Sequence, residues 1–372
     1  MRQMSNSYIL APRDLLIGVG TSGFTAMTGI ILDGTTEKVA IKYYPSATSP
    51  ITDIAIRLAV TGNPGSFKIG VFANTYAVNS NGSPDDASQL SGWSTTFDLA
   101  VTGWTSLLAL ATNSGNLVNG TPVWIVIVWD SDVCDVSNYI QLQQFNTFNY
   151  GSNRILQRHY NGTDWVTTAG TTTFPVVVIK HADGTYTGMP ITASIAASAA
   201  PDIFVNTGVS QVQGFRFKCG SQVKVQGLSY YLTKANTPND LIWSIYEGDT
   251  LKYSQTELVA NVLNGTPSVV WFDTPVLLAA DTYLYIIASQ TGTSGTNDYD
   301  LRCWTIDAAY IDASLPADMR FVYGNGSTPS ALTVATTEIP WCFPIISDPA
   351  LDLDMVAGNT SIYPPLDNWI MR

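Results

Sequence analysis

Short segments in which apolar and polar residues alternate follow one another along most of the chain, with turn residues between them. Residues 54–58 and 67–71 each place an apolar side chain at every second position, which is the pattern of a strand with one buried face. Residues 123–129 form a continuous apolar run, typical of a strand buried on both faces. Five Asn-Gly pairs supply the positive φ angles that tight hairpins need. Because long helical periodicity is absent, the pattern predicts an all-β fold.

The order of these segments is repeated along the chain. Shifts of 174, then 160, then 165 positions align alternating strand, Pro turn, apolar strand, Tyr strand and final Pro strand in the same order. The shift shortens midway, which indicates a longer central loop in the first copy, near residues 74–91. The matched pairs include Ile54 with Leu228, Phe67 with Leu241, residues 123–127 with residues 283–287, Tyr139 with Tyr299, and Phe174 with Ile339.

The repeat predicts two tandem antiparallel jelly-roll-like β-sandwich domains with extended N- and C-terminal arms. A chain of 372 residues exceeds what one core usually holds, and about eight strands per copy can bury two inner faces. The predicted parts are an N-terminal arm over 1–30, a first sandwich over 31–187, a linker over 188–200, a second sandwich over 201–347 and a C-terminal docking tail over 348–372.

The C-terminal tail is apolar for a free chain end. Two prolines favour an extended backbone there, and the apolar side chains need a surface to cover them. The tail is expected to dock either on its own sandwich or on a neighbouring subunit. The candidate assembly contacts are Tyr363, Leu366, Trp369 and Ile370.

Charge is scarce and predominantly negative. Charged residues make up 12% of the chain and the net charge is −12, with no basic cluster. Phosphate neutralisation needs concentrated Lys and Arg, so nucleic-acid binding is disfavoured, as is docking on anionic lipid. The longest apolar run is too short to span a bilayer. No charged segment followed by an apolar one marks a signal peptide, so we expect synthesis in a host cytoplasm and no membrane insertion.

Nothing in the sequence assembles a catalytic set. The two histidines, His159 and His181, stand outside any metalloprotease or deaminase pattern, and neither a nucleophile elbow nor a phosphate-binding loop is present. A polysaccharide-degrading enzyme would need two facing carboxylates. The aspartates stand almost entirely in turn contexts, where they can bond the turn's own backbone. The sequence therefore predicts no catalytic residue and a protein that is not an enzyme.

No cofactor is expected, and calcium is the metal that the sequence favours if one binds. Asp130, Asp132 and Asp135 place carboxylates close together in a loop, as oxygen-ligand sites often do. The alternative is a solvated acidic turn.

The four cysteines, Cys134, Cys219, Cys303 and Cys342, lack the paired spacing of zinc or redox motifs. They are expected to be buried free thiols.

Two tryptophans stand in loop-like settings, Trp93 in Ser-Gly-Trp-Ser and Trp165 in Gly-Thr-Asp-Trp. A Trp in a polar loop can stack on a sugar ring while Asn and Asp bond the hydroxyls. It can equally cap a sandwich edge or anchor a protein interface. Trp93 and Trp165 are the candidate ligand-binding residues.

A Thr-, Asn- and Gly-rich tandem β-sandwich with arms at both ends resembles accessory virion proteins of tailed bacteriophages, which include head decoration, head fibre and tail proteins. The modules are also similar in style to carbohydrate-binding jelly rolls. The resemblance implies a virion-surface protein that contacts other virion subunits, and itself as a homo-oligomer. The alternative is a lectin-like protein that binds a cell-surface glycan or receptor.

Overall fold

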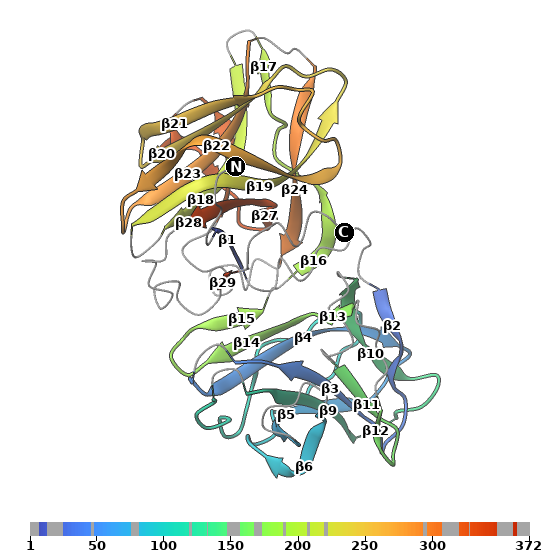
Figure 1. Cartoon of the computed structure of the whole chain (residues 1–372). Helices are drawn as coiled ribbons and strands as arrows, with labels where there is room; N and C mark the ends of the chain where they lie inside the picture. The colour runs from blue at the N-terminus through green and yellow to red at the C-terminus, as the bar shows by residue number, and fades with distance from the viewer. Residues whose placement is uncertain are drawn as a thin grey trace. The chain divides into compact units, whose positions relative to one another are not determined.

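Antiparallel strands are the main secondary structure of the chain, in a computed structural model (Figure 1). The Cα positions divide it into two units, which we describe separately: residues 14–190, called the first sandwich, and residues 1–13 with 191–372, called the second sandwich. Among the described residues, no helix is long and apolar enough to cross a membrane. The structure describes residues 7–12, 25–45, 48–75, 82–118, 121–131, 133–146, 157–166, 173–188, 191–206, 209–218, 222–292, 296–306, 320–326, 328–347 and 360–362.

The described strands of the first sandwich form two sheets. The eight-stranded sheet has the order β13-β10-β4-β14-β15, with β2 on β10 and β7 and β8 on β4; the six-stranded sheet has the order β12-β11-β3-β9-β5-β6. The strands are β2 (Thr25–Leu32), β3 (Lys38–Tyr43), β4 (Ile51–Thr61), β5 (Ser66–Asn74), β6 (Pro84–Gln89), β7 (Gly103–Trp104), β8 (Leu108–Ala109), β9 (Val123–Ser131), β10 (Tyr139–Asn146), β11 (Gln157–Tyr160), β12 (Trp165–Val166), β13 (Thr173–Pro175), β14 (Val177–His181) and β15 (Tyr186–Gly188).

The core of the first sandwich lies between its two sheets. Ile54 and Ile56 of β4 and Ile125 and Ile127 of β9 belong to one buried cluster, and none of the four is exposed. The residues that alternate with them in β9 face the opposite side of the six-stranded sheet, where Trp124 and Val126 belong to a smaller buried cluster. The run 123–129 is therefore apolar on both faces because both faces are covered, as its pattern predicts.

The second sandwich also has two sheets within the described residues. The eight-stranded sheet has the order β16-β24-β19-β28-β1-β29, with β22 on β19 and β27 on β24; the seven-stranded sheet has the order β21-β20-β23-β18-β25-β26, with β17 on β18. The strands are β1 (Ser7–Pro12), β16 (Ile191–Ala197), β17 (Phe204–Asn206), β18 (Val209–Lys218), β19 (Val223–Ala235), β20 (Leu241–Glu247), β21 (Thr250–Glu257), β22 (Thr266–Leu278), β23 (Tyr283–Gln290), β24 (Asp298–Ile306), β25 (Arg320–Asn325), β26 (Thr333–Val334), β27 (Glu338–Pro340), β28 (Cys342–Ser347) and β29 (Thr360–Ile362), with one 3-10 turn, η3 (Pro329–Ala331).

Aromatic pairs join the two sheets of the second sandwich. Phe215 of β18 meets Phe343 of β28 edge to face at 6.1 Å between ring centroids, and Tyr230 of β19 packs on Trp243 of β20 at 4.9 Å. The buried carboxylate of Glu257 accepts hydrogen bonds from the Tyr230 hydroxyl at 2.7 Å and from the Trp243 Nε1 at 2.9 Å. The polar ends of both rings are thus satisfied inside the core, as buried aromatic polar groups require.

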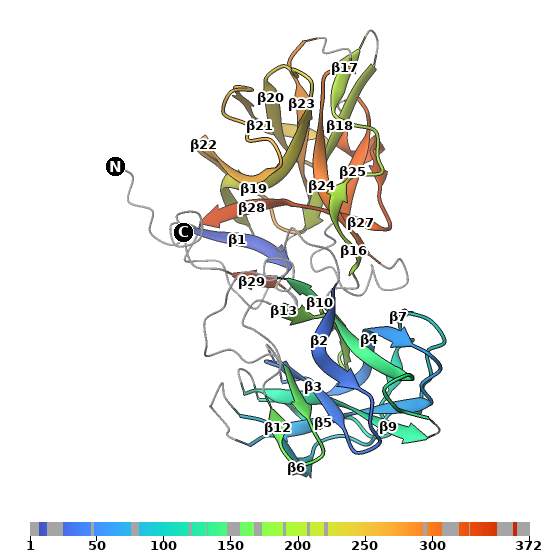
Figure 2. The same cartoon turned by 90° about the vertical axis from the view of Figure 1, so that its right-hand side faces the viewer.

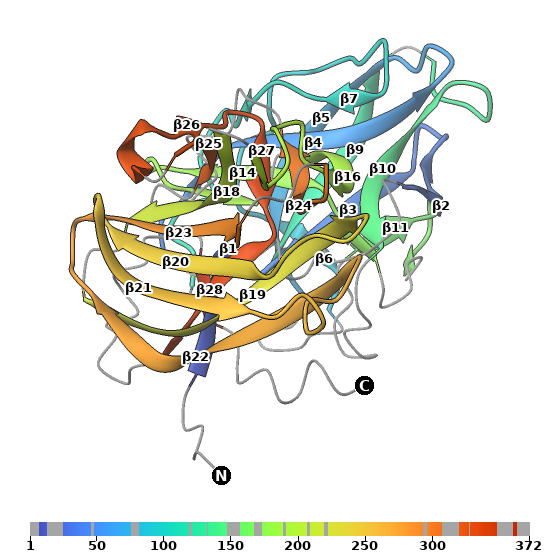
Figure 3. The same cartoon turned by 90° about the horizontal axis from the view of Figure 1, so that it is seen from above.

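The strand order of the first sandwich recurs in the second, which supports the repeat read from the sequence. The central strands β13-β10-β4-β14 match β27-β24-β19-β28, and β12-β11-β3-β9-β5-β6 matches β26-β25-β18-β23-β20-β21. Each sandwich also has one further strand at an equivalent place: β2 pairs with β10 in the first sandwich, and β16 pairs with β24 in the second. Figure 3 shows the strands of the second sandwich from above.

The register of the repeat differs from the sequence alignment by one residue at the apolar strand. Ile69 pairs with Ile127, and its counterpart Trp243 pairs with Ala288. Ile127 therefore corresponds to Ala288, whereas the 160-residue shift matches it with Ile287. A one-residue slip in a strand exchanges the two faces of the sheet. Ile287 belongs to a separate buried cluster with Val212, Tyr285, Val322 and Leu332, whereas Ala288, on the other face, is fully buried.

The same comparison corrects the alignment at the next strand. Thr61 pairs with Tyr139, and Ala235, at the corresponding position, pairs with Asp298. Tyr139 thus corresponds to Asp298 and not to Tyr299. The two one-residue corrections have opposite sign, so a single shift of 160 averages over them.

Strand β1 occupies a position in the second sandwich that a neighbouring hairpin strand fills in the first. Figure 2 shows β1 beside β28. In the first sandwich β15 follows β14 in the chain and pairs with it. In the second sandwich the matching strand, β28, pairs instead with β1 from the N-terminal end of the chain, through Ser7–Ile9. Leu10–Pro12 of β1 pair in turn with β29. β1 therefore lies between two strands of the C-terminal end.

Two predicted connecting segments contain strands. Residues 191–197 of the predicted linker form β16, and residues 25–30 of the predicted arm belong to β2. The first segment is rich in small residues, as a linker often is, but its backbone pairs with β24. This pairing satisfies backbone N–H and C=O groups that would otherwise be exposed at a sheet edge. The predicted tail contacts Tyr363, Leu366, Trp369 and Ile370 lie outside the described residues.

Candidate functional site

The outer face of the six-stranded sheet in the first sandwich carries a row of aromatic and cationic side chains. Strand pairing places Tyr160, Lys38, Val128 and Lys68 side by side across β11, β3, β9 and β5. Lys38 and Lys68 are two strands apart, about 10 Å. Because alternate residues face opposite sides of a strand, this row lies on the face away from the main core.

Trp165 lies at one end of this row. β12 pairs Trp165 with Tyr160, and the two ring centroids are 5.4 Å apart. The Lys38 ammonium lies 4.9 Å from the Tyr160 centroid and 6.0 Å from the Trp165 centroid, which is within cation–π range. Lys38 also forms an ion pair with Asp86 at 2.7 Å. The Trp165 ring is thus half-buried and partly covered by a neutralised lysine.

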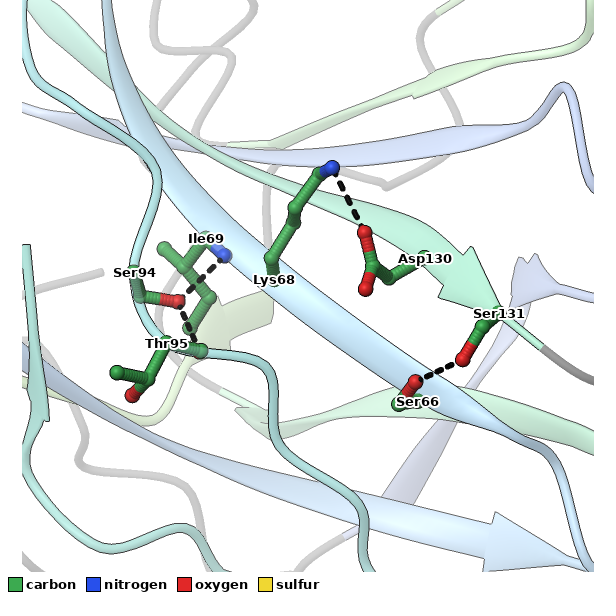
Figure 4. Close-up of polar contacts among 7 residues, drawn as sticks. All are labelled: Ser66, Lys68, Ile69, Ser94, Thr95, Asp130 and Ser131. Carbon is green, nitrogen blue, oxygen red and sulfur yellow. Dashed lines mark hydrogen bonds and ion pairs between the residues drawn. The ribbon is translucent and has the colours of Figure 1, made fainter. Parts of the chain in front are cut away.

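Trp93 lies at the other end of the row, beside two serines whose hydroxyl groups accept the hydrogen bonds that a neighbouring strand would otherwise accept. The Ser94 and Ser91 hydroxyls accept hydrogen bonds from the backbone N–H groups of Ile69 and Val71 along the edge of β5. The Ser94 bond is drawn in Figure 4. The side chain of Trp93 then folds over the sheet, where its ring is 5.5 Å from that of Phe72.

A glycine and a lysine complete the Trp93 contact. A Cβ at Gly70 would lie 3.0 Å from the Trp93 ring, so the missing side chain makes room for the indole. The Lys68 ammonium lies 5.4 Å from the Trp93 centroid and is paired with Asp130 at 2.7 Å (Figure 4). The structure therefore brings Trp93 and Trp165 to the same small cluster, but both rings already have a cation against them.

Lysines are the feature of this face that sequence reasoning missed. The Lys42 ammonium lies 4.7 Å from the Trp124 ring, and burial, with a smaller contribution from the charge of Arg158, lowers the pKa of Lys42 to about 8. Alternation shows that these lysines face outward, but not that aromatic rings from distant segments cover them. With its cations matched to rings or carboxylates, the face is a closed structural surface rather than an open platform.

The carboxylates considered for calcium have other partners. Asp130 pairs with Lys68. Asp135 accepts hydrogen bonds from the backbone N–H groups of Ser137 and Asn138 at 2.8 and 2.9 Å, which lower the pKa of its carboxyl. Asp132 lies outside the described residues. Within the described ranges, no group of three or more His, Cys, Asp or Glu side chains is arranged to hold a metal ion.

The two histidines lie in separate environments. The His181 Nδ1 is 3.1 Å from the Ser49 carbonyl, and its Nε2 is 3.2 Å from the Thr187 hydroxyl; burial lowers the pKa of His181. The His159 Nε2 is 3.6 Å from Glu37, whose pKa burial raises. His181 is thus satisfied by core hydrogen bonds, whereas the buried His159 Nε2 lies near one carboxylate but has no hydrogen-bond partner among the described residues.

Three cysteines are buried free thiols, as the sequence predicts: Cys134, Cys303 and Cys342. Burial raises the pKa of each, so they are poor nucleophiles at neutral pH. Cys219 lies outside the described residues.

Comparison with models of known families finds no match, and no curated protein sequence is similar to the chain. Among solved structures, the apo lectin of Pleurotus ostreatus has 9% identity, with 90% of this chain and 89% of that chain covered and a TM-score of 0.23. A structure of infectious bursal disease virus, Gt strain, has 12% identity, with 99% and 88% covered and a TM-score of 0.17. Likenesses at these TM-scores establish neither fold nor function.

Proposed function

We propose that the protein is a non-enzymatic structural component of an assembled particle. The class that its sequence resembles, accessory virion proteins of tailed bacteriophages, suggests capsid decoration, a head fibre or a tail component, displayed on the virion surface. Its partners would be other virion proteins and further copies of itself.

The observation that carries this proposal is the addition of terminal strands to the second sandwich. β1 and β29 extend the sheet beyond β28, so segments near both chain ends are joined to a domain through main-chain hydrogen bonds. Strand addition to an open sheet edge is a common means by which subunits are joined, because any extended backbone can supply the bonds. The same edge can therefore be completed within one chain or across an assembly.

The composition supports the same function. Only 12% of the residues are charged, and the cations on the outer face of the first sandwich are used for internal contacts. A surface with few charges has less desolvation to overcome when it packs against neighbours.

The proposal is tested on particles purified from lysates of the producing cells. The full-length protein should sediment with the particles in a density gradient and be detected on them by gold-labelled antibody in negative-stain images. Light scattering should show oligomers of the purified protein. A free monomer that degrades polysaccharide, and is absent from every particle fraction, would refute the proposal.

The alternative function, glycan binding through Trp93 and Trp165, is not favoured by the packing of these two residues. It remains a prediction that a glycan array tests, with W93A and W165A as the variants. Loss of binding in either variant would restore it.

A further inference from the structure

We propose that a pocket on the outer face of the second sandwich binds one uncharged sugar ring. This site goes beyond the structural role proposed above and does not involve either tryptophan singled out from the sequence. The pocket has a volume of about 220 Å³ and opens to solvent. Its lining comes from β18, β20, β23 and the turn after β25: Ser210, Val212, Ser244, Tyr246, Ile287, Ser289 and Gly326.

The lining combines an apolar floor with hydroxyl groups. Val212 and Ile287 belong to a buried cluster on this face, and the Tyr246 ring packs against that cluster. Pairing sets Ile287 beside Ser244 across β23 and β20. The strands therefore fix both an apolar surface and an adjacent hydroxyl.

The first sandwich shows what fits at this place. By strand register, Ser244 and Tyr246 correspond to Gly70 and Phe72. In the first sandwich the indole of Trp93 lies against those two residues. A flat ring system built into one copy thus occupies the position that the other copy leaves open.

The open position in the second sandwich has a clear structural cause. Where the segment with Trp93 runs along the edge of β5, the regular strand β21 runs along β20. The residue of β21 beside Ser244 is the exposed Ser254, with 3.4 Å between the two hydroxyl oxygens. A serine there cannot cover the sheet as an indole does.

The lining favours a sugar over an ion or a charged peptide. None of its seven residues is charged, so an ionic ligand would be desolvated without a partner. In the described part of the chain, the Ser210 and Ser289 hydroxyls have no hydrogen-bond partner and can bond ligand hydroxyls. At about 220 Å³ the pocket is smaller than the sites of drug-sized ligands, which limits it to a single ring.

The site can be tested by saturation-transfer NMR on the full-length protein. The probes are the methyl glycosides of glucose, galactose, mannose and rhamnose, with N-acetylglucosamine and N-acetylgalactosamine. Each is used at about 10 mM, which nearly saturates a site with a Kd of about 1 mM. p-Cresol serves as a probe for an aromatic side chain of a partner protein. We expect transfer to at least one sugar and a weaker signal for p-cresol.

Two variants and one control locate the binding. S244L places a leucine where the indole lies in the first sandwich and should weaken sugar binding at least tenfold. S210A/S289A removes two hydroxyls without filling the pocket and should weaken binding about tenfold, as two lost hydrogen bonds imply. T95L, at an exposed position of the first sandwich, should bind like the wild type.

Three results would overturn the proposal. These are no transfer to any of the six sugars, sugar binding that S210A/S289A leaves unchanged, and p-cresol binding that S244L abolishes while no sugar binds. The last result would assign the pocket to a protein side chain. Circular dichroism of each variant shows whether the fold is kept, and the double alanine variant decides the matter if S244L does not fold.

Discussion

Asp300 is a carboxyl group buried in the second sandwich, and its protonation should control the stability of that domain. It lies on β24 and is 6% exposed. Its oxygens accept hydrogen bonds from the Ser198 backbone N–H at 3.0 Å and the Gln213 Nε2 at 3.1 Å. These bonds favour the ionised form, but burial outweighs them and raises the pKa of Asp300 from 3.8 to about 7, with a smaller contribution from Asp202.

The pKa shift fixes the direction of the pH dependence. Between pH 3.8 and about 7, the folded protein retains a proton on Asp300 that the unfolded chain releases. The free energy of unfolding therefore falls as the pH rises through this window. At 1.36 kcal/mol per pKa unit, a shift of about three units gives an upper limit of about 4 kcal/mol, which entry of water into the site would reduce.

The perturbation to make is Asp300→Asn, which keeps the shape and an accepting oxygen but removes the titration. Urea unfolding of both proteins at pH 4.5, 5.5, 6.5 and 7.5 measures the free energies of unfolding. Because both Asp300 oxygens accept from N–H donors, the Asn NH2 group faces a donor, so D300N should be less stable than wild type at the lowest pH. This deficit should shrink as the pH rises. If the difference between them does not change with pH, Asp300 has an ordinary pKa and the reasoning is wrong.

Three further changes test the packing. S7C/S347C joins two residues paired between β1 and β28, at a Cα separation that suits a disulfide; the oxidised protein should show a bridged species in peptide mapping, and none would mean that β1 lies elsewhere. E257A removes the carboxylate that accepts hydrogen bonds from two buried donors and should lower the free energy of unfolding by about 2–6 kcal/mol, with E257Q less affected; equal stability of E257A and wild type in urea would contradict this. W93A should lower the free energy of unfolding by about 2 kcal/mol, which is less than for a fully buried aromatic residue because the ring is half-buried. An unchanged Tm would show that the indole is not packed on the sheet.

The fold class and the repeat could be predicted because both depend on local pattern. Alternation in 54–58 and 67–71 reports which side of a strand is buried, and the structure buries the apolar positions of both segments. The register could not be predicted, because Ile287 and Ala288 are both apolar and the strand β23 is covered on both faces. Only the pairing partners distinguish them.

The candidate site could be predicted only in part. Trp93 is notable in the sequence because polar residues surround it, yet its position depends on contacts with β5, more than twenty residues away in the chain. The pocket in the second sandwich gave no sequence signal, since isolated serines in strands such as Ser244 and Ser289 are common. Its correspondence to the position of the Trp93 indole appears only when the strands of the two copies are matched by register.

The position of β1 also determines when the second sandwich can complete its sheet during synthesis. β1 is synthesised before the other described strands of its domain, and its neighbour β28 follows more than 300 residues later, about 20 to 70 s at ordinary rates of translation. During that interval the first strand has no partner from its own domain, while the first sandwich can already fold. Contacts this distant in sequence form slowly, so the pairing of β1 with β28 is a late step that must wait for the synthesis of β28.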